Sequence, residues 1–359
     1  MKPVKIAILS LTHGHTRKYF QTLHDNPALD WVAVSAETPE VRDVFYHYGY
    51  NEIPCYMSDD EMFDAHPEIE AVVIASANSR HLEQVKNCAR RGIHVLSMKI
   101  PTFDMAEYDE MIRVVDQAGI VFQIELEMHY NPVVYRMKEL FAKKALGNVA
   151  SFNATNITLS PVWAFPWQGV PELSWGKREP LREGDPRFRG GALCDHPHIF
   201  DMIRWLTGSD YEYIYAEVGP NIRPDIEEED VILVNGKMKN GVSFLLDPSW
   251  SRLEERLKVP APGWEIFPKR MEVNFNISGD KGVMLVDSFG PNVYHNGAPN
   301  DRYTVQYTYF DEWIGLIDEF VDCLRNHHTP KINLGWHRRT IEAVNACYES
   351  VRTGQPVYF

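Results

Sequence analysis

The chain has 359 residues, of which 44% are hydrophobic and 24% charged, a composition that excludes disordered, collagen-like and disulfide-rich proteins and predicts two domains. It carries 36 Lys and Arg against 50 Asp and Glu, and the net charge of −14 disfavours nucleic acid and anionic lipid as partners. Because no apolar run approaches the ~20 residues that span a bilayer, and five scattered cysteines form no CxxC pair, we expect a reduced, cytoplasmic protein outside the membrane.

Buried strands alternate with helical segments through the first third of the chain. The strands are β-rich apolar runs at residues 4–11, 31–35, 71–76, 93–98 and 120–127. Helical segments of about 10–15 residues separate several of them, which forces parallel pairing through right-handed crossovers. The expected fold of this part is a doubly wound parallel sheet, and such sheets bind ligands at the carboxyl ends of their strands.

Alternating, aromatic-rich strands dominate the rest of the chain. The clearest lie at residues 148–160, 211–218, 230–238, 241–250, 270–279 and 282–288. Several are joined by Asn-Gly or Gly-Asp-Lys-Gly turns, which are typical of hairpins in an antiparallel sheet. Helices are expected from residue 132 and over 192–206, 311–326 and 337–353. We place a domain boundary near residue 127, which gives one domain over 1–127 and a second over 128–359.

The turn after the first strand is the place where a doubly wound sheet can bind the phosphates of a dinucleotide. Glycines usually line that turn, because close approach of the backbone to a diphosphate tolerates no side chain. Residues 10–15 contain a single glycine, Gly14, and a plain turn explains the segment equally well. The side chains of Ser10 and Thr12 are small enough to admit a phosphate and to donate hydroxyl hydrogen bonds to it.

An acidic residue follows the second strand. At this place a carboxylate accepts hydrogen bonds from an adenosine ribose and excludes a 2′-phosphate. Glu37 stands one position later than expected, so ribose contact and plain solvent exposure both remain open. Glu40 adds a second negative charge, and the nearest cation in the sequence is Arg42. We therefore expect NAD to be preferred to NADP by about one order of magnitude in affinity.

Lys99 directly follows the buried strand at residues 93–98. Burying an ammonium group is costly unless it is paired, so a lysine at this position needs a physical reason. In a cleft it polarises a substrate hydroxyl or relays its proton. The alternative is a surface lysine whose charged end reaches water.

The densest group of titratable residues lies between Arg189 and Asp201. Asp195, His196 and His198 crowd the first turn of a predicted helix, behind two glycines that allow a tight entry. A carboxylate beside an imidazole suits general-base chemistry, because the acid fixes the tautomer and supports the imidazolium. The same three side chains suit Zn or Mn, and helix capping by Asp195 with half-buried histidines is a third interpretation.

An aromatic cluster precedes this group. Trp163, Phe165, Trp167 and Trp175 fall in a segment rich in Pro and Gly. Aromatic rings stack on the C–H faces of sugars, so the segment is a candidate carbohydrate-binding wall, and ordinary loop packing explains it about as well.

Taken together, these segments resemble the Gfo/Idh/MocA family, the glucose–fructose oxidoreductase and inositol dehydrogenase group, over nearly the whole chain. The resemblance is carried by Ala77-Asn78 with His81, HVLSMKIP around Lys99, Tyr130-Asn131-Pro132, GGALCDHPHIFDMIRWL at 190–206 and the closing pattern FVDCLRNHHTP…EAVNACYESVRTGQPV. The chain departs from the family pattern at the glycine fingerprint and at the displaced acid of the second strand. It also has Met98 for the Glu of Glu-Lys-Pro, with the proline delayed to Pro101, and Ile199 where the family has a histidine.

The resemblance implies a Rossmann domain, a second α/β domain with a large open, mainly antiparallel sheet, and NAD(P)-dependent oxidation of a sugar or polyol hydroxyl. Lys99 matches the lysine of the family's Glu-Lys-Pro motif, and Asp195 matches the Asp of its Asp-x-x-x-His motif, with His198 or His196 substituting for the histidine. A homodimer or homotetramer is also implied, because the family's open sheet usually buries one face against another subunit. Two alternatives remain: tightly held NAD that assists glycoside cleavage or elimination, and a non-catalytic sugar-binding protein.

These arguments lead to a defined set of site residues. The predicted NAD site, with NADP less favoured, consists of Ser10, Thr12, His13, Gly14, His15, Glu37, Ser76, Asn78, His81 and Lys99. The predicted catalytic residues are Lys99, Asp195, His196 and His198, and the predicted substrate contacts are His129, Asn131, Trp163 and Trp167. No resident metal is predicted.

Overall fold

The computed structural model describes residues 2–13, 15–158, 191–222, 229–251, 271–288, 292–296, 302–306 and 311–359. They form two compact units. The first contains residues 2–126 and 313–338, and the second contains the described residues of 127–312 that remain, together with 339–359. The chain leaves the first unit at residue 126, next to the predicted boundary. Residues 313–338, which we assigned to the second domain, belong to the first unit instead.

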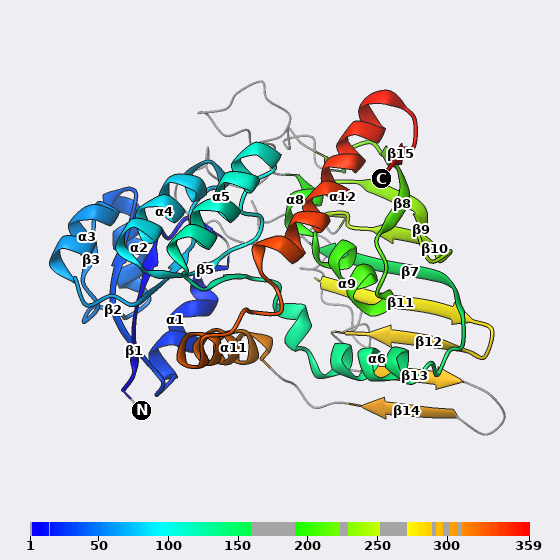
Figure 1. Cartoon of the computed structure of the whole chain (residues 1–359), viewed down its shortest axis with the longest axis horizontal. Coiled ribbons are helices and arrows are strands. Elements are labelled where there is room, and N and C mark those ends of the chain that lie inside the picture. The colour runs from blue at the N-terminus through cyan, green and yellow to red at the C-terminus, as the bar shows by residue number, and fades with distance from the viewer. Residues whose placement is uncertain are drawn as a thin grey trace, which may run out of the picture. The chain divides into compact units, whose positions relative to one another are not determined.

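The first unit is built on a six-stranded parallel sheet with the strand order β3-β2-β1-β4-β5-β6 (Figure 1). Its strands are β1 (Val4–Leu9), β2 (Leu29–Ser35), β3 (Cys55–Tyr56), β4 (Ala71–Ile74), β5 (His94–Ser97) and β6 (Phe122–Ile124). The central strands β1 and β4 are almost wholly buried, as expected for a sheet covered on both faces. This order confirms the predicted doubly wound sheet.

Helices cover both faces of this sheet. They are α1 (Thr16–Asp25), α2 (Pro39–His47), α3 (Asp59–Ala65), α4 (Asn78–Arg91), α5 (Met105–Ala118) and most of α11 (Glu312–Asn326), and α12 (Leu334–Thr353) follows. Trp313 of α11 packs edge-on against Tyr19 of α1, and the carbonyl of Leu316 accepts a hydrogen bond from the amide of Gln123 at 3.0 Å. These contacts explain why α11 joins the first unit although it lies near the end of the chain.

The second unit is built on a nine-stranded sheet with the order β14-β13-β12-β11-β7-β10-β9-β8-β15. Its strands are β7 (Val149–Thr158), β8 (Tyr211–Val218), β9 (Ile232–Met238), β10 (Ser243–Asp247), β11 (Met271–Gly279), β12 (Gly282–Asp287), β13 (Asn292–Asn296), β14 (Arg302–Gln306) and β15 (Val357–Tyr358). Only β7 and β10 pair in parallel, and every other neighbouring pair is antiparallel. The predicted large, mainly antiparallel sheet is therefore confirmed.

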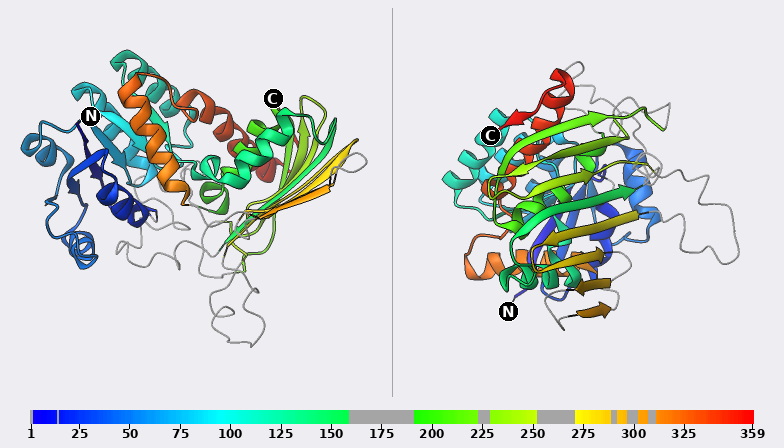
Figure 2. Two further views of the ribbon diagram at one scale, coloured as in Figure 1. Left: turned by 90° about the horizontal axis from the view of Figure 1, so that it is seen from below. Right: turned by 90° about the vertical axis from the view of Figure 1, so that its right-hand side faces the viewer.

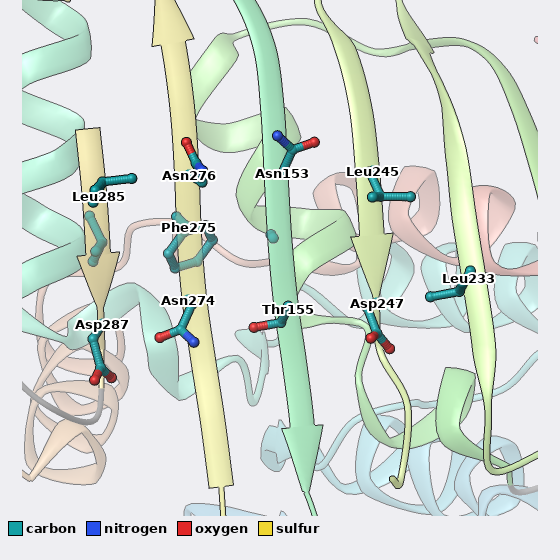
Figure 3. A pocket seen from close by; sticks show the side chains of 12 residues that line it. Asn153, Thr155, Leu233, Leu245, Asp247, Asn274, Phe275, Asn276, Leu285 and Asp287 are labelled. Atoms are coloured by element: carbon teal, nitrogen blue, oxygen red, sulfur yellow. The ribbon is translucent and has the colours of Figure 1, made fainter. Parts of the chain in front are cut away.

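The two faces of this second sheet differ. Helices α6 (Pro132–Ala142) and α9 (His198–Thr207) lie on one face, whereas no described helix lies over the other (Figure 2). On the uncovered face Leu233, Leu245 and Leu285 are 48%, 46% and 44% exposed. They line a groove of about 540 Å³ (Figure 3). Polar side chains also line it, namely those of Asn153, Thr155, Asp247, Asn274, Asn276 and Asp287.

The helix expected over 192–206 is interrupted. The structure has two helices here, α8 (Ala192–Asp195) and α9, which begins at His198. His196 and Pro197 lie between them and belong to neither helix. Proline lacks the N–H that an uninterrupted helix needs at this point, which accounts for the break. A single-turn 3₁₀ helix, η1 (Glu127–Tyr130), precedes α6. Across the described residues, no helix combines the length and apolar character needed to cross a membrane.

Candidate functional site

The turn after β1 has an unusual backbone. Ser10 adopts a φ of 73°, in the left-handed region that glycine usually occupies, and it is buried. The N–H groups of the turn donate within the protein: Ser10 N to Ser35 Oγ (3.0 Å), Thr12 N to Ser10 Oγ (3.3 Å), His13 N to Ala75 O (3.0 Å), His15 N to His13 Nδ1 (3.1 Å) and Thr16 N to His13 O (3.1 Å). A glycine-rich cradle would instead point such groups at a phosphate. Gly14 lies outside the described residues.

His13 ties this turn to the end of β5. Its Nε2 lies 3.2 Å from the carbonyl oxygen of Lys99, and its Nδ1 accepts the N–H of His15 at 3.1 Å. Because a carbonyl can only accept, Nε2 carries the proton, and Nδ1 carries none. His13 is therefore a neutral, buried imidazole with a structural role.

His15 is hydrogen-bonded to a buried glutamate. Its Nδ1 lies 2.7 Å from Glu125 Oε1, and Glu125 Oε2 accepts the hydroxyl of Tyr19 at 3.1 Å. The Glu125 side chain is 0% exposed and that of His15 is 21% exposed. Trp313 meets the rings of His15 and Tyr19 edge-on, with centroids 5.2 and 5.1 Å away. Since a carboxylate accepts, Nδ1 of His15 holds a proton, and the imidazole is the exposed end of the pair.

Glu37 lies just after β2 and pairs with an arginine. Its Oε1 accepts from Arg80 Nη1 at 2.7 Å, and Arg80 Nη2 lies 3.7 Å from Asp59 Oδ2. Burial raises the pKa of Glu37, while the Ser10 hydroxyl and the Arg80 charge oppose this rise. Among the described residues, Oε2 of Glu37 is buried without a hydrogen-bond partner. A buried acceptor without a donor fits the hydroxyl of a ribose.

Two hydrogen bonds fix Ser76, which lies just after the end of β4. Ser76 Oγ donates to Gln84 Oε1 at 2.6 Å, and His81 Nε2 donates to the carbonyl of Ser76 at 3.0 Å. Desolvation lowers the pKa of the fully buried His81 to about 4, so this imidazole is neutral. Asn78, the first residue of α4, is partly exposed at the same edge of the sheet.

Lys99 is 1% exposed and follows β5 at the carboxyl edge of the first sheet. The peptide bond after it is cis. The surface-lysine alternative is wrong, since nearly the whole side chain is removed from water. Ser10, Thr12, Glu37, Ser76 and Lys99 thus follow four strands that end at one edge of the first unit.

Asp195 and His196 are anchored within the second unit. Asp195 Oδ2 accepts from Trp250 Nε1 at 2.9 Å and lies 3.3 Å from His196 Nε2. His196 Nδ1 donates to the carbonyl of Pro248 at 2.6 Å. Both nitrogens of His196 therefore face protein groups, which favours a structural role. Asp195 ends α8 rather than starting a helix, so the capping interpretation is wrong.

His198, the first residue of α9, stands beside a second glutamate. Its Nε2 lies 3.7 Å from Glu127 Oε1, a separation longer than a direct hydrogen bond. The His198 side chain is 3% exposed and that of Glu127 is 13% exposed. The general-base role that we predicted for His198 with Asp195 stays a prediction.

His129 and Asn131, two of the predicted substrate contacts, form hydrogen bonds within the protein. His129 Nε2 lies 2.5 Å from Asp201 Oδ2, both side chains are 0% exposed, and Thr340 Oγ1 donates to the other Asp201 oxygen at 2.9 Å. Asn131 caps α6 by accepting the N–H of Val133 at 2.8 Å. A substrate contact by His129 would have to use its Nδ1, which is buried and has no hydrogen-bond partner among the residues that the structure describes.

Gly191, directly before α8, has a clear structural reason. A Cβ on Gly191 would meet the carboxylate of Glu229 at 2.3 Å, and that carboxylate accepts the N–H of Leu193 at 3.1 Å. Trp163 and Trp167 lie outside the described residues. Within the described ranges no three His, Cys, Asp or Glu side chains are arranged to hold a metal ion.

Several residues at the first unit's edge were missed by sequence reasoning. Glu125, Tyr19 and Trp313 surround His15, and Arg80 is the cation nearest to Glu37, where the sequence suggested Arg42. Arg42 instead pairs with Asp43 at 3.1 Å. The available signal for Glu125 was a charged residue inside a predicted buried strand, the same signal that drew attention to Lys99.

Comparison with known proteins gives matches to both halves of the chain. Residues 6–126 match the model described as an oxidoreductase family with an NAD-binding Rossmann fold, and residues 134–285 match the C-terminal domain model of the same GFO/IDH/MocA family. A myo-inositol 2-dehydrogenase from Thermotoga maritima is 23% identical over 276 residues, which cover 74% of this chain and 73% of the relative.

Two further relatives bear on function and fold. A 2,7-anhydro-N-acetylneuraminate hydratase from Mediterraneibacter gnavus is 26% identical over 189 residues, 51% of this chain and 46% of that protein. The chain spans about half the length of the first curated relatives it matches. A solved oxidoreductase from Agrobacterium radiobacter, in complex with NAD+, L-tartaric acid and magnesium, has a TM-score of 0.79 and 17% identity, covering 99% of this chain and 98% of that one.

Proposed function

Because this chain belongs to the Gfo/Idh/MocA family of NAD-binding oxidoreductases, we propose that it transfers a hydride between NAD and a secondary hydroxyl of a sugar or polyol. The named activity of the inositol dehydrogenase relative supports this class of substrate. The single observation that carries the proposal is the burial of the Lys99 ammonium group at the ligand-binding edge of the parallel sheet.

The first unit fits NAD at its adenosine end. Oε2 of Glu37, which has no hydrogen-bond partner within the described part of the chain, is an acceptor suited to a ribose hydroxyl. Arg80 lies between the carboxylates of Glu37 and Asp59. The 2′-phosphate of NADP would be repelled by these two carboxylates unless Arg80 broke its ion pairs with them and bound the phosphate instead. NAD is therefore the expected cofactor rather than NADP.

Lys99 is the proposed proton-transfer residue. Bound NAD supplies the hydride acceptor or donor, while the protein must manage the hydroxyl proton. A nearly dry lysine side chain polarises a hydroxyl or takes its proton more readily than a solvated one. His198 of the second unit is the other candidate for proton transfer, and Asp195 its proposed support.

The test is a comparison of Lys99→Met with Lys143→Met, which removes an exposed lysine at the end of α6. NADH formation is followed with a panel of polyols and sugars. A general base contributes about 10²–10⁴-fold, so Lys99→Met should lose turnover by that factor while still binding NAD. Turnover equal to that of Lys143→Met would remove Lys99 from the mechanism.

The hydratase relative favours a second candidate. In this version NAD stays bound, and transient oxidation of the sugar assists addition or elimination with no net redox change. Dinucleotide that co-purifies with the protein, together with substrate turnover and no accumulation of NADH, would support it. Stoichiometric NADH release would exclude it.

We further propose that the uncovered face of the nine-stranded sheet packs against a second copy of the chain, as a homodimer or as part of a homotetramer. Its exposed leucines, Leu233, Leu245 and Leu285, form an apolar surface that favours burial. A species of about 41 kDa in sedimentation at micromolar concentration would contradict this. A cytoplasmic location is consistent with the five cysteines, all of them free thiols.

A further inference from the structure

A pocket at the amino-terminal edge of the first sheet takes no part in the proposed function. Its volume is about 450 Å³, which is within the range of small-molecule sites. It is lined by His94, the first residue of β5, and by Phe122, the first residue of β6, whereas Lys99 follows the other end of β5. Every residue that lines it belongs to the first unit. A ligand in this pocket therefore occupies a different site from one bound at the carboxyl edge.

The pocket is lined by apolar and polar side chains in similar measure. The apolar ones come from α5, from residues 120–122 and from the first turn of α12, and include Ile112, Val115, Ile120, Phe122 and Leu334. The polar ones are His94, Asp116, His327, His328, Thr329 and Asn333. An apolar lining with a few polar groups is typical of a site that binds an organic molecule rather than a bare ion.

Two of the polar side chains are engaged within the protein. Asn333, directly before α12, accepts the N–H of Trp336 at 3.0 Å and so caps that helix. His328 donates from Nε2 to Asp322 at 2.7 Å, and its Nδ1 lies 3.2 Å from the thiol of Cys323. Both side chains therefore shape the pocket rather than offer it hydrogen-bond donors.

His94 does offer the pocket a donor. Its Nδ1 accepts the N–H of Val121 at 2.9 Å, so the ring proton is on Nε2. That nitrogen forms no hydrogen bond with any residue that the structure describes. Burial lowers the pKa of His94, the neighbouring His327 lowers it further, and Glu70 opposes the change. His94 is therefore a neutral imidazole whose remaining N–H lacks a protein acceptor within the described ranges.

His327 places a second imidazole at the same pocket. It directly follows the last residue of α11 and has a φ of 54°, a left-handed conformation that glycine adopts without strain. Its side chain is exposed and lies near enough to His94 to disfavour a positive charge there. An anion between the two rings would accept the Nε2 proton of His94 and relieve this repulsion.

We propose that this pocket binds a small monocarboxylic acid. The carboxylate accepts the Nε2 proton of His94 beside the imidazole of His327, and the hydrocarbon part of the acid packs against Ile112 and Leu334. Asp116 of α5 also lines the pocket and is exposed, so it disfavours a second negative charge on the ligand. The proposal concerns a site separate from that of NAD and does not depend on the hydride-transfer reaction.

The test is titration of the full chain with benzoate, by calorimetry and by the NMR signals of the histidine rings. A ligand of this size should bind with about millimolar affinity. Benzyl alcohol, which lacks the charge, and formate, which lacks the hydrocarbon, should each bind at least tenfold more weakly. Saturating NAD should leave the affinity for benzoate within twofold, because the two sites lie at opposite ends of the strands.

Four variants make the result specific. His94→Asn keeps an acceptor for the N–H of Val121 but has no donor at the place of Nε2, and it should lose about ten- to hundredfold in benzoate affinity. His327→Gly removes the second imidazole, suits the left-handed backbone and should lose at least threefold while unfolding at no lower temperature than wild type. Asp116→Asn should bind benzoate at least as tightly as wild type. His24→Ala, which removes a 51% exposed histidine on α1, is the matched control.

Four results would overturn the proposal. The first is that benzoate does not bind at millimolar concentrations, and the second is that benzyl alcohol binds as tightly. The third is competition between benzoate and NAD, which would place the acid at the carboxyl edge. The fourth is a benzoate affinity in folded His94→Asn within twofold of that in His24→Ala. If His94→Asn does not fold, His327→Gly decides the question by the same comparison.

Discussion

Each unit of the molecule contains one His-x-His turn, and the two turns are built alike. His13 and His196, the first histidines, are held at both ring nitrogens by protein groups. His15 and His198, the second histidines, each face a glutamate. The two glutamates, Glu125 and Glu127, are two residues apart in the chain.

The two histidine–glutamate pairs differ in the distance between their side chains and in the burial of the glutamate. His15 and Glu125 are 2.7 Å apart with the carboxylate fully buried, whereas His198 and Glu127 are 3.7 Å apart with the carboxylate 13% exposed. Only the first is a hydrogen bond. The same local motif thus gives a direct histidine–glutamate hydrogen bond in one unit and a longer contact in the other. The partner in each case comes from a part of the chain that is distant in sequence.

The largest expected effect comes from removing each glutamate in turn. Glu125→Ala leaves the Nδ1 of His15 and the hydroxyl of Tyr19 without their acceptor, and we expect a loss of about 2–3 kcal/mol in the free energy of unfolding. Glu127→Ala should cost less than Glu125→Ala, because the 3.7 Å separation from His198 is longer than a direct hydrogen bond. Urea unfolding of both variants measures the difference, and equal losses would show that the two pairs are not distinct.

The next prediction concerns His81, a buried histidine of the first unit. Burial lowers the pKa of His81 to about 4, below that of an unfolded histidine. Between pH 6.5 and 4 the unfolded chain therefore binds a proton that the folded chain does not, so stability falls as the pH is lowered, by about 2 kcal/mol between pH 7 and pH 5. In His81→Gln this part of the pH dependence should vanish. An unchanged slope of stability against pH in that variant would rule out a neutral His81.

The smallest effect concerns the cofactor's ribose. Glu37→Gln keeps the shape but removes the charge, so the preference for NAD over NADP should narrow by about tenfold in affinity. Glu40→Gln, an exposed acid on α2, is the matched control and should change the preference less than twofold. Arg80→Ala should not improve NADP binding. If Glu37→Gln and Glu40→Gln behave alike, Glu37 does not select the cofactor.

Much of the fold was predictable because it depends on local pattern. The continuous apolar runs became β1, β2, β4 and β5, and the alternating runs became the long strands of the second sheet. Helices α2 and α3 were missed although Thr38-Pro39 and Ser58 with Glu61 are helix-start signals. The edge strands β3 and β15 were missed because two residues carry no periodicity.

The site was predictable only in part. Lys99 and Glu37 were identified because a charged residue that follows a buried strand can be recognised from the amino-acid sequence alone. The partners that determine the behaviour of these side chains come from elsewhere in the chain: Glu125 is 110 positions from His15, and Arg80 is 43 positions from Glu37. Burial of a carboxylate is a property of tertiary packing, so no spacing rule distinguishes Glu125 from Glu127.

The internal bonding of the turn after β1 has a consequence for the dynamics of binding. The amides of Ser10, Thr12, His13 and His15 are hydrogen-bonded within the described part of the protein, so their protons should exchange slowly with solvent even in the ligand-free protein. A ligand then docks on a surface that is already ordered and bears little entropic penalty for immobilising the chain. Such a turn is less adaptable than a flexible glycine loop, and the ligand must fit the shape that the turn already has.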